Sequence, residues 1–370
     1  YFLHSDKFGQ RHIIFAFKLW LRLGVMITTE HDWRDQLTSA IKTHEELEEF
    51  FAHQFPRTQY PIFIPRTWAA RIRDFGVSSA LGRQFLPNDH ELAPEGMIDP
   101  IGDHNHSPTK QVVHRYSNRL LFFPTSVCPV QCRYCFRKNE LHNNDELFRP
   151  DFEGVSKYLR NNPQVEEIIF SGGDPLMLSN DKLSKCLDHF AKLEIPMVRF
   201  HTRMPVIMPE RMDDGFWQLL ESASEKFSVV TVVIHLNHLD EISNELVAAM
   251  QRFRSLKVQW LSQSVLLKEV NDTATDLKNL FMGLLKIGVK PYYLHHPDQV
   301  RGGMHFWLPI EEGRKIFASL RNQLPGHAIP QYVLDIPGGE GKVPLFNPEG
   351  FEFSGQLLNK NGELTPYFYN

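Results

Sequence analysis

Three cysteines lie close together in this sequence of 370 residues, at Cys128, Cys132 and Cys135, with the spacing C-x3-C-x2-C. Three thiolates on one short loop can bind three irons of a cubane [4Fe–4S] cluster, and the fourth iron is then open to a substrate-like ligand. A structural zinc site would need a fourth protein ligand. The remaining cysteine, Cys186, falls inside an amphipathic helical segment and is better interpreted as a small buried hydrophobic residue. The motif therefore predicts an iron–sulfur cluster.

Two glycine-rich segments also have the residue types needed to hold ligands. Ser171-Gly-Gly-Asp174 combines glycines, which let the backbone approach a ligand, with an acid that can accept a hydrogen bond from an ammonium group. The second segment runs from Asp335 to Lys342 with the sequence DIPGGEGK. It could form a phosphate cradle, although it lacks P-loop spacing. A mobile loop that presents one lysine also suits covalent binding of a carbonyl group.

Short β-rich runs and helix-length amphipathic segments alternate after residue 113. This alternation predicts βα units and a parallel sheet. Six units are too few for an eight-stranded barrel, so we predict an α/β fold with a partial (β/α)6 TIM-like barrel, which a seventh run at Gln331–Leu334 extends. The six runs are Leu120–Phe123, Glu167–Phe170, Met197–His201, Val229–His235, Val258–Leu261 and Val289–Leu294, and the helical segments include Phe152–Asn161, Lys182–Leu193 and Thr273–Ile287.

Polar residues follow the apolar runs at the point where each run ends. In a βα barrel the site forms at the carboxyl ends of the strands, so these segments should meet on one face. In chain order they are the three cysteines, SGGD, HTR, HLNH, QS and HHPD.

The sequence pattern predicts that the chain has three parts. Residues 1–112 are predicted to form an N-terminal helical region and linker, with Thr43 as a helix N-cap and a loop from Leu86 to Pro108. The barrel is expected at 113–325, and a short C-terminal extension with the lysine loop at 326–370. The apolar stretch Ile13–Thr28 is short for a membrane span and lacks a signal-peptide cleavage site. We interpret it as a leader that is either packed or foreign, with Met26 as a candidate start.

The composition of the chain limits the classes of partner that it is expected to bind. A net charge of −4 creates no long-range field for nucleic acid or an anionic membrane. The clustered cysteines favour a metal site in a reducing compartment over a disulfide scaffold. We therefore expect a cytoplasmic protein that binds neither nucleic acid nor membrane.

The cysteine motif resembles that of radical S-adenosylmethionine enzymes, and the chain from about Trp33 to Pro344 resembles the lysine 2,3-aminomutase family. The resemblance implies an isomerase in which the open iron binds S-adenosylmethionine and the reduced cluster cleaves it to a 5′-deoxyadenosyl radical. Several positions match the family's contacts with S-adenosylmethionine, although a structural role for the last three is equally consistent. These positions are Ser171, Gly172, Gly173, Asp174, Arg203, His235 and Gln263.

The same resemblance implies a second cofactor, pyridoxal 5′-phosphate. The lysine loop resembles the family's PGGGGK loop, with Glu340 in place of a glycine, and its Lys342 matches the residue that holds this cofactor. The family's phosphate- and ring-binding residues match Arg115, Tyr116 and Arg119, for which the alternative is a solvated basic turn. Arg137 matches the arginine that pairs with the substrate α-carboxylate. Asp298 and Asp335 match the pair that holds the distant ammonium of lysine.

We therefore expect a mutase that moves the α-amino group of L-lysine to C3, giving β-lysine, with a reducing donor such as flavodoxin or ferredoxin. A homo-oligomer is compatible with the resemblance, although the short C-terminal tail departs from the family's usual assembly. Without the extra cysteines of clostridial-type relatives, the chain is expected to bind no zinc. One alternative acts on a lysine of translation elongation factor P, since His295 is similar to the residue in relatives that modify that protein. Two further alternatives are a radical enzyme without pyridoxal 5′-phosphate and a non-catalytic metal-binding module.

Overall fold

The structure is a computed structural model that describes residues 33–140, 152–346, 355–358 and 363–367. The apolar stretch Ile13–Thr28, with Met26, lies outside the described residues. Among the helices that are described, none combines the length and the apolar character needed to cross a bilayer.

Four short helices precede the sheet: α2 (Trp33–Thr38), α3 (His44–Phe51), α4 (Arg66–Phe75) and α5 (Ala80–Phe85). Helix α3 begins as predicted, because the Thr43 side chain accepts the Glu46 N–H at 3.2 Å and the Glu46 carboxylate accepts the Thr43 N–H at 3.2 Å. The predicted loop from Leu86 to Pro108 contains two single-turn 3-10 helices and otherwise irregular backbone.

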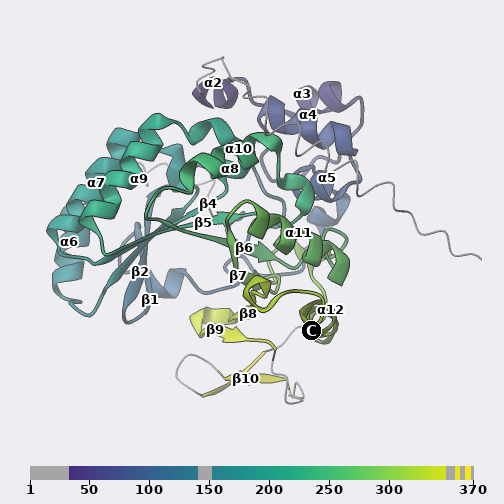
Figure 1. Ribbon diagram of the computed structural model, residues 1–370. Coiled ribbons are helices and arrows are strands. Elements are labelled where there is room, and N and C mark those ends of the chain that lie inside the picture. The colour runs from purple at the N-terminus through teal and green to yellow at the C-terminus, as the bar shows by residue number, and fades with distance from the viewer. Residues whose placement is uncertain (1–32, 141–151, 347–354, 359–362, 368–370) are drawn as a thin grey trace, which may run out of the picture. The chain divides into compact units, whose positions relative to one another are not determined.

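The central sheet has nine strands in simple chain order, from β1 to β9. Strands β2 to β8 are parallel, while the edge strands β1 and β9 are antiparallel to their neighbours. The six predicted runs form β2 to β7 and the seventh forms β8, which confirms the partial barrel (Figure 1). The bounds are β1 (Val112–Tyr116), β2 (Arg119–Thr125), β3 (Glu167–Gly172), β4 (Met197–Thr202), β5 (Val229–His235), β6 (Gln259–Val265), β7 (Lys290–His295), β8 (Gln331–Ile336) and β9 (Gly341–Pro344).

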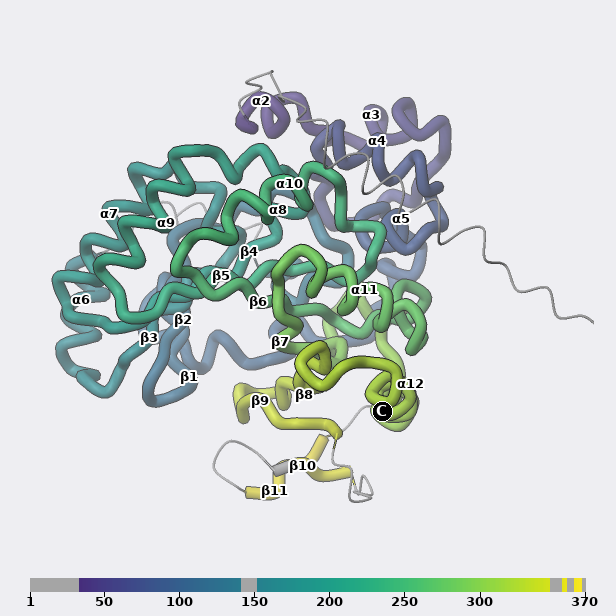
Figure 2. The backbone as a smooth tube through the Cα atoms, in the orientation of Figure 1, coloured from purple at the N-terminus to yellow at the C-terminus, as the bar shows by residue number. Residues whose placement is uncertain are grey.

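The connecting helices pack on the outside of this sheet, and after each helix the chain returns to the next strand (Figures 1 and 2). Helix α9 packs against α7 and β5, and α11 packs against α12 and β7. The helices are α6 (Phe152–Arg160), α7 (Asn180–Lys192), α8 (Met204–Ile207), α9 (Asp214–Lys226), α10 (Asn244–Phe253), α11 (Ala274–Lys286) and α12 (Ile310–Arg321). Cys186 is buried within α7, as predicted. Strands β10 (Gln356–Leu358) and β11 (Leu364–Pro366) form a separate hairpin.

The strand sequences explain this arrangement. Strand β5 reads VVTVVIH, and Val232, Val233 and Ile234 in it are fully buried. A parallel strand covered on both faces needs such a nearly continuous apolar run. Its final residue, His235, is polar and lies at the carboxyl end, where the barrel face begins. The apolar core thus fixes where the chain leaves each strand, and with it the position of the polar residues that follow.

Candidate active site

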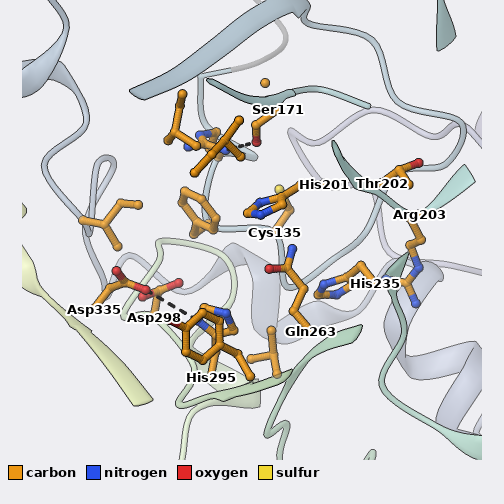
Figure 3. Close-up of a pocket in the computed structure, with 18 of the residues that line it drawn as sticks. Cys135, Ser171, His201, Thr202, Arg203, His235, Gln263, His295, Asp298 and Asp335 are labelled. Atoms are coloured by element: carbon orange, nitrogen blue, oxygen red, sulfur yellow. Dashed lines mark hydrogen bonds and ion pairs between the residues drawn. The ribbon is translucent and has the colours of Figure 1, made fainter. Parts of the chain in front are cut away.

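One cavity of about 500 Å³ opens among the carboxyl ends of the strands and extends into the sheet. Every residue for which the sequence predicted a site role lines this cavity. Figure 3 shows Asp298, Asp335 and His295 on one side of the close-up and Gln263, His235 and Arg203 on the other. The predicted lining residues are Arg115, Tyr116, Arg119, Cys128, Cys132, Cys135, Arg137, Ser171, Gly172, Gly173, Asp174, Arg203, His235, Gln263, Asp298, Asp335 and Lys342.

The three cysteines lie on the loop that follows β2, and their thiols are half-buried and unpaired by disulfides. Strand β3 supports this loop through backbone hydrogen bonds: Gly173 N–H donates to Thr125 O at 2.9 Å and Asp174 N–H donates to Val127 O at 2.8 Å. A Cβ atom at Gly173 would lie 2.3 Å from Val127 O. Glycine is therefore required there, because the two loops meet backbone to backbone.

A buried group of charges holds the same loop from the other side. Arg133 Nε donates to Glu91 Oε1 at 2.7 Å, and Lys138 Nζ donates to Arg133 O at 2.7 Å and to Gly302 O at 2.8 Å. The side chains of Arg133, Lys138 and Glu91 are all almost completely buried. No sequence pattern pointed to this group, because Glu91 lies in the predicted linker and no spacing rule connects it with the cysteine loop.

Three clustered thiols fit an iron–sulfur cluster as a donor set. Burial raises the pKa of Cys128 and Cys132, and it raises the pKa of Cys135 to about 11. The raised pKa values mean that the free thiols stay protonated. A bound metal would reverse this, since coordination deprotonates a thiol. Arg203 Nη1 lies 3.2 Å from Cys132 Sγ, so a cationic donor faces one of the sulfurs.

Asp174 is buried, and its carboxylate is fully engaged by the protein. It accepts hydrogen bonds from Thr202 Oγ1 at 2.7 Å, from the backbone N–H of Arg203 at 2.7 Å, and from the N–H groups of Met204 and Leu176 at 3.0 Å. Asp174 therefore joins the end of β3 to the turn after β4 and fixes the position at which Arg203 leaves the sheet.

Arg203 and His235 belong to one buried hydrogen-bond network. Arg203 donates to Glu241 and to the hydroxyl of Tyr134, and that hydroxyl lies 2.7 Å from His235 Nε2. Burial, followed by the charge of Arg203, lowers the pKa of His235 well below its usual value, so the imidazole is neutral at pH 7. Gln263 pairs with His235 in the register of β5 and β6. The Tyr134 and Glu241 positions were not predicted from the sequence.

Lys342 lies on the edge strand β9, opposite Asp335 on β8. Its Nζ donates to Asp335 Oδ2 and lies 3.4 Å from His295 Nδ1. Burial alone would raise the pKa of Asp335, but the neighbouring Lys342 and His295 hold it well below its usual range. The backbone N–H of Lys342 donates to Tyr116 Oη at 2.6 Å, which joins β9 to β1 across the opening of the sheet.

Asp298 follows β7 and faces the cavity beside this group. Among the described residues, no hydrogen bond or ion pair reaches its carboxylate. Burial, and then the negative charge of Asp335, raise the pKa of Asp298 to about 8. Within the described part of the chain, the site thus contains one acid that is ion-paired, Asp335, and one that forms no ion pair, Asp298.

The predicted arginines are held by an acid that the sequence did not reveal. Asp103 Oδ2 accepts from Arg137 Nε at 3.0 Å and Nη2 at 2.7 Å, and Asp103 Oδ1 accepts from Arg115 Nη2 at 2.7 Å. Arg137 Nη1 points instead to Ser171 Oγ, at 3.5 Å. Arg119 stacks on Tyr116, with its guanidinium carbon 3.8 Å from the ring centroid.

Comparison with known proteins decides the family. The domain family described as a 4Fe-4S single cluster domain matches residues 117–200. The L-lysine 2,3-aminomutase of Escherichia coli (strain K12) is 32% identical over 329 residues, which cover 86% of this chain and 95% of that protein. The L-lysine 2,3-aminomutase of Clostridium subterminale is 32% identical over 357 residues, or 91% of this chain and 84% of that protein. The chain belongs to the lysine 2,3-aminomutase family.

A lysine 2,3-aminomutase is an isomerase, and enzymes of this family use a [4Fe–4S] cluster, S-adenosylmethionine and pyridoxal 5′-phosphate. This family member places three thiols at one part of its cavity and a lysine with an acid pair at another. A solved structure of TYW1 with a lysine-pyruvate adduct bound is 14% identical, with a TM-score of 0.34, and covers 56% of this chain and 74% of that chain. At that TM-score it adds nothing to the assignment.

Proposed function

We propose that this family member moves the α-amino group of free L-lysine to C3, giving β-lysine, and that pyridoxal 5′-phosphate binds at Lys342. The observation that carries the proposal is the shared cavity: the cysteine loop, the acid pair Asp298 and Asp335, and Lys342 all line one space. A radical generated at the cysteines could therefore reach a substrate held at the lysine without leaving this cavity.

The cysteine end supports binding of a cluster and S-adenosylmethionine. Cys128, Cys132 and Cys135 would hold three irons, and Gly172 and Gly173, which line the same cavity, let the end of β3 pack closely against the chain that leads into the cysteine loop. His235 and Gln263 would line the cofactor from β5 and β6. The cluster and S-adenosylmethionine together would supply a radical that abstracts hydrogen.

The opposite end supports binding of pyridoxal 5′-phosphate. Lys342 would bind its aldehyde, and Arg115 lines the cavity near Arg119, which stacks on the ring of Tyr116, where an anionic phosphate and a flat ring fit. This cofactor would supply a conjugated ring that stabilises the transferring nitrogen. The protein groups would bind and orient it.

The charges of the cavity are complementary to lysine. Arg137 Nη1 is the part of that guanidinium not committed to Asp103, so it is available for the α-carboxylate. Asp298 lacks a cationic partner among the described residues and would pair with the ε-ammonium. An amino acid with an anionic side chain would place like charge against Asp298 and Asp335, which disfavours it.

The test is product analysis with isotopic label. The purified chain is reconstituted anaerobically with iron, sulfide, S-adenosylmethionine, pyridoxal 5′-phosphate and a low-potential reductant such as flavodoxin, then given L-lysine labelled with ¹⁵N at the α-position. We expect β-lysine carrying ¹⁵N on C3, detected by NMR. If free lysine is unchanged while elongation factor P gains the corresponding modification, the proposal fails and the protein-lysine alternative replaces it.

A further inference from the structure

His295 has no assigned role, yet its side chain contacts both Lys342 and Asp335 in the cavity. It is the last residue of β7, and its Nδ1 atom lies 3.4 Å from Lys342 Nζ and 3.5 Å from Asp335 Oδ2. The three residues come from the neighbouring strands β7, β8 and β9. Rigid strands therefore hold a lysine, a carboxylate and an imidazole in mutual contact.

An amine must lose a proton before it can bind an aldehyde, because an ammonium group has no lone pair. In this structure Lys342 Nζ is an ion-paired donor to Asp335. Asp335 is a poor acceptor for that proton, since Lys342 and His295 hold its pKa well below the usual range. A base that is neutral at pH 7 and has a free lone pair has to come from another neighbour.

His295 meets that requirement. Burial, and then the positive charge of Lys342, lower the pKa of His295, so its imidazole is neutral at pH 7. A neutral imidazole has one nitrogen with a lone pair. Nδ1 can accept from Lys342, and once protonated it can donate to Asp335, because both partners lie within 3.5 Å of this one atom. Such distances commonly shorten when the ligand binds.

We infer that His295 is the base that takes a proton from Lys342, with Asp335 stabilising the protonated imidazole. One N–H bond of the Lys342 ammonium breaks and one N–H bond forms at His295 Nδ1. The products are a neutral amine and an imidazolium paired with a carboxylate, so charge and atoms balance. This inference rests on the proposed binding of pyridoxal 5′-phosphate at Lys342.

Other ionisable groups face the same three residues. Asp298 lies beside Asp335 in the cavity (Figure 3), and Arg115 Nη1 on β1 lies 3.8 Å from Asp335 Oδ1. The ring centroid of Tyr293 on β7 lies 5.4 Å from Lys342 Nζ. His201 on β4 and His235 on β5 also interact electrostatically with His295, and both are neutral because burial lowers their pKa. Of these histidines, His295 contacts Lys342.

The experiment measures how fast Lys342 captures pyridoxal 5′-phosphate, without a cluster or S-adenosylmethionine. The rate is followed by absorbance from about pH 5 to 9, and borohydride trapping with mass spectrometry of the Lys342 peptide confirms the site. The key variant is His295→Asn, since the Asn amide reaches the position of Nδ1 and keeps hydrogen bonding there but takes up no proton. His295→Gln is the second variant, and thermal unfolding checks that each folds. The control is His53→Gln, which changes an exposed histidine in the loop after α3 that does not line the cavity.

We expect wild type to lose its capture rate only as the pH falls through the lowered pKa of His295. His295→Asn should be at least about tenfold slower at pH 7, with a rate that rises steadily into the alkaline range. A wild-type rate and pH profile in a folded His295→Asn protein would overturn the inference and assign His295 a purely structural role. If wild type itself captures no pyridoxal 5′-phosphate at Lys342, the proposed function and this inference both fail.

Discussion

The hydroxyl of Tyr116, on the first strand of the sheet, accepts the backbone N–H of Lys342, on the last strand, at 2.6 Å. Strands β1 and β9 are the two edges of an incomplete barrel, and no ladder of hydrogen bonds joins them in the described residues. Around the same opening, a Cβ atom on Gly102 would lie 2.4 Å from the carbonyl carbon of Gly338. The edges thus meet at the loop that presents Lys342.

Replacing Tyr116 with Phe should loosen this junction. The change leaves the Lys342 N–H without its partner, and a buried unpaired donor typically costs about 1–3 kcal/mol. We expect pyridoxal 5′-phosphate to bind about tenfold more weakly, measured by spectroscopic titration. Tyr158→Phe is the control, because its hydroxyl lies 2.8 Å from His114 Nδ1 outside the cavity. Equal affinity in the two variants would contradict the assigned role of Tyr116.

Lysine binding should release a proton from Asp298. Its pKa of about 8 means that the acid is largely protonated at pH 7, whereas pairing with an ammonium requires the carboxylate. Calorimetry in buffers of different ionisation enthalpy should therefore detect proton release below pH 8, and Asp298→Asn should abolish it. Norleucine, which lacks the ε-ammonium, is the matched ligand control. Proton release that persists in Asp298→Asn would assign it to another group.

Asp298 should also make stability fall with rising pH. Its folded-state pKa is raised, so between the usual carboxyl value near 3.8 and about 8 the folded protein binds more protons than the unfolded chain. The stabilisation is complete at low pH and is lost as the pH rises through about 8. Denaturant unfolding of the ligand-free protein should show a shallower decline across this range for Asp298→Asn than for wild type.

Glu91→Gln should be strongly destabilising. The change leaves Arg133 and Lys138 as buried cations without their counter-ion, and breaking a buried ion pair in this way costs about 3–5 kcal/mol. Chemical denaturation measures the loss. The control is Asp214→Asn, which removes an ion pair between Arg252 and a largely exposed Asp214 and should cost less than about 1 kcal/mol. Similar losses in both variants would show that the buried group does not stabilise the cysteine loop.

Gly173→Ala should impair cluster assembly. The added methyl group would collide with the backbone of the cysteine loop at Ser126 and Val127, and forcing extra volume into such a contact costs about 1–3 kcal/mol. We expect less iron per chain after anaerobic reconstitution. Gly326→Ala is the control, because no other atom lies within 4 Å of the added Cβ. Full iron content in Gly173→Ala would contradict this prediction, because it would mean that the cysteine loop can shift to accept the methyl group and still bind the cluster.

Single replacements of the cysteines should show which of them bind the iron–sulfur cluster. Alanine at Cys128, Cys132 or Cys135 should abolish the iron–sulfur absorbance, because each leaves only two thiolates on the loop. Alanine at Cys186, which is buried in α7, should leave the absorbance intact. Loss of the cluster in Cys186→Ala with a normal melting temperature would place that residue among the ligands.

The strands β2 to β8 could be predicted because each is a short apolar run, and burial on both faces of a parallel sheet demands such a run. Strands β1 and β9 were not predicted. The sequence VVHRY at Val112–Tyr116 mixes apolar and basic residues, and GKVP at Gly341–Pro344 is too short to show a period. These edge strands depend on their neighbours more than on their own sequences.

By itself, the sequence determined the thiol spacing, the lysine loop and the order of strands and helices, because each depends on residues close together in the chain. The tertiary structure alone decided which charges meet: Asp103 with Arg137, Glu91 with Arg133, and His295 with Lys342. Those partners lie on different loops and strands, and the curvature of the sheet brings them together. Local sequence patterns do not depend on such distant contacts. These charge pairs, and the proton transfer proposed for His295, could therefore be inferred only from the tertiary structure.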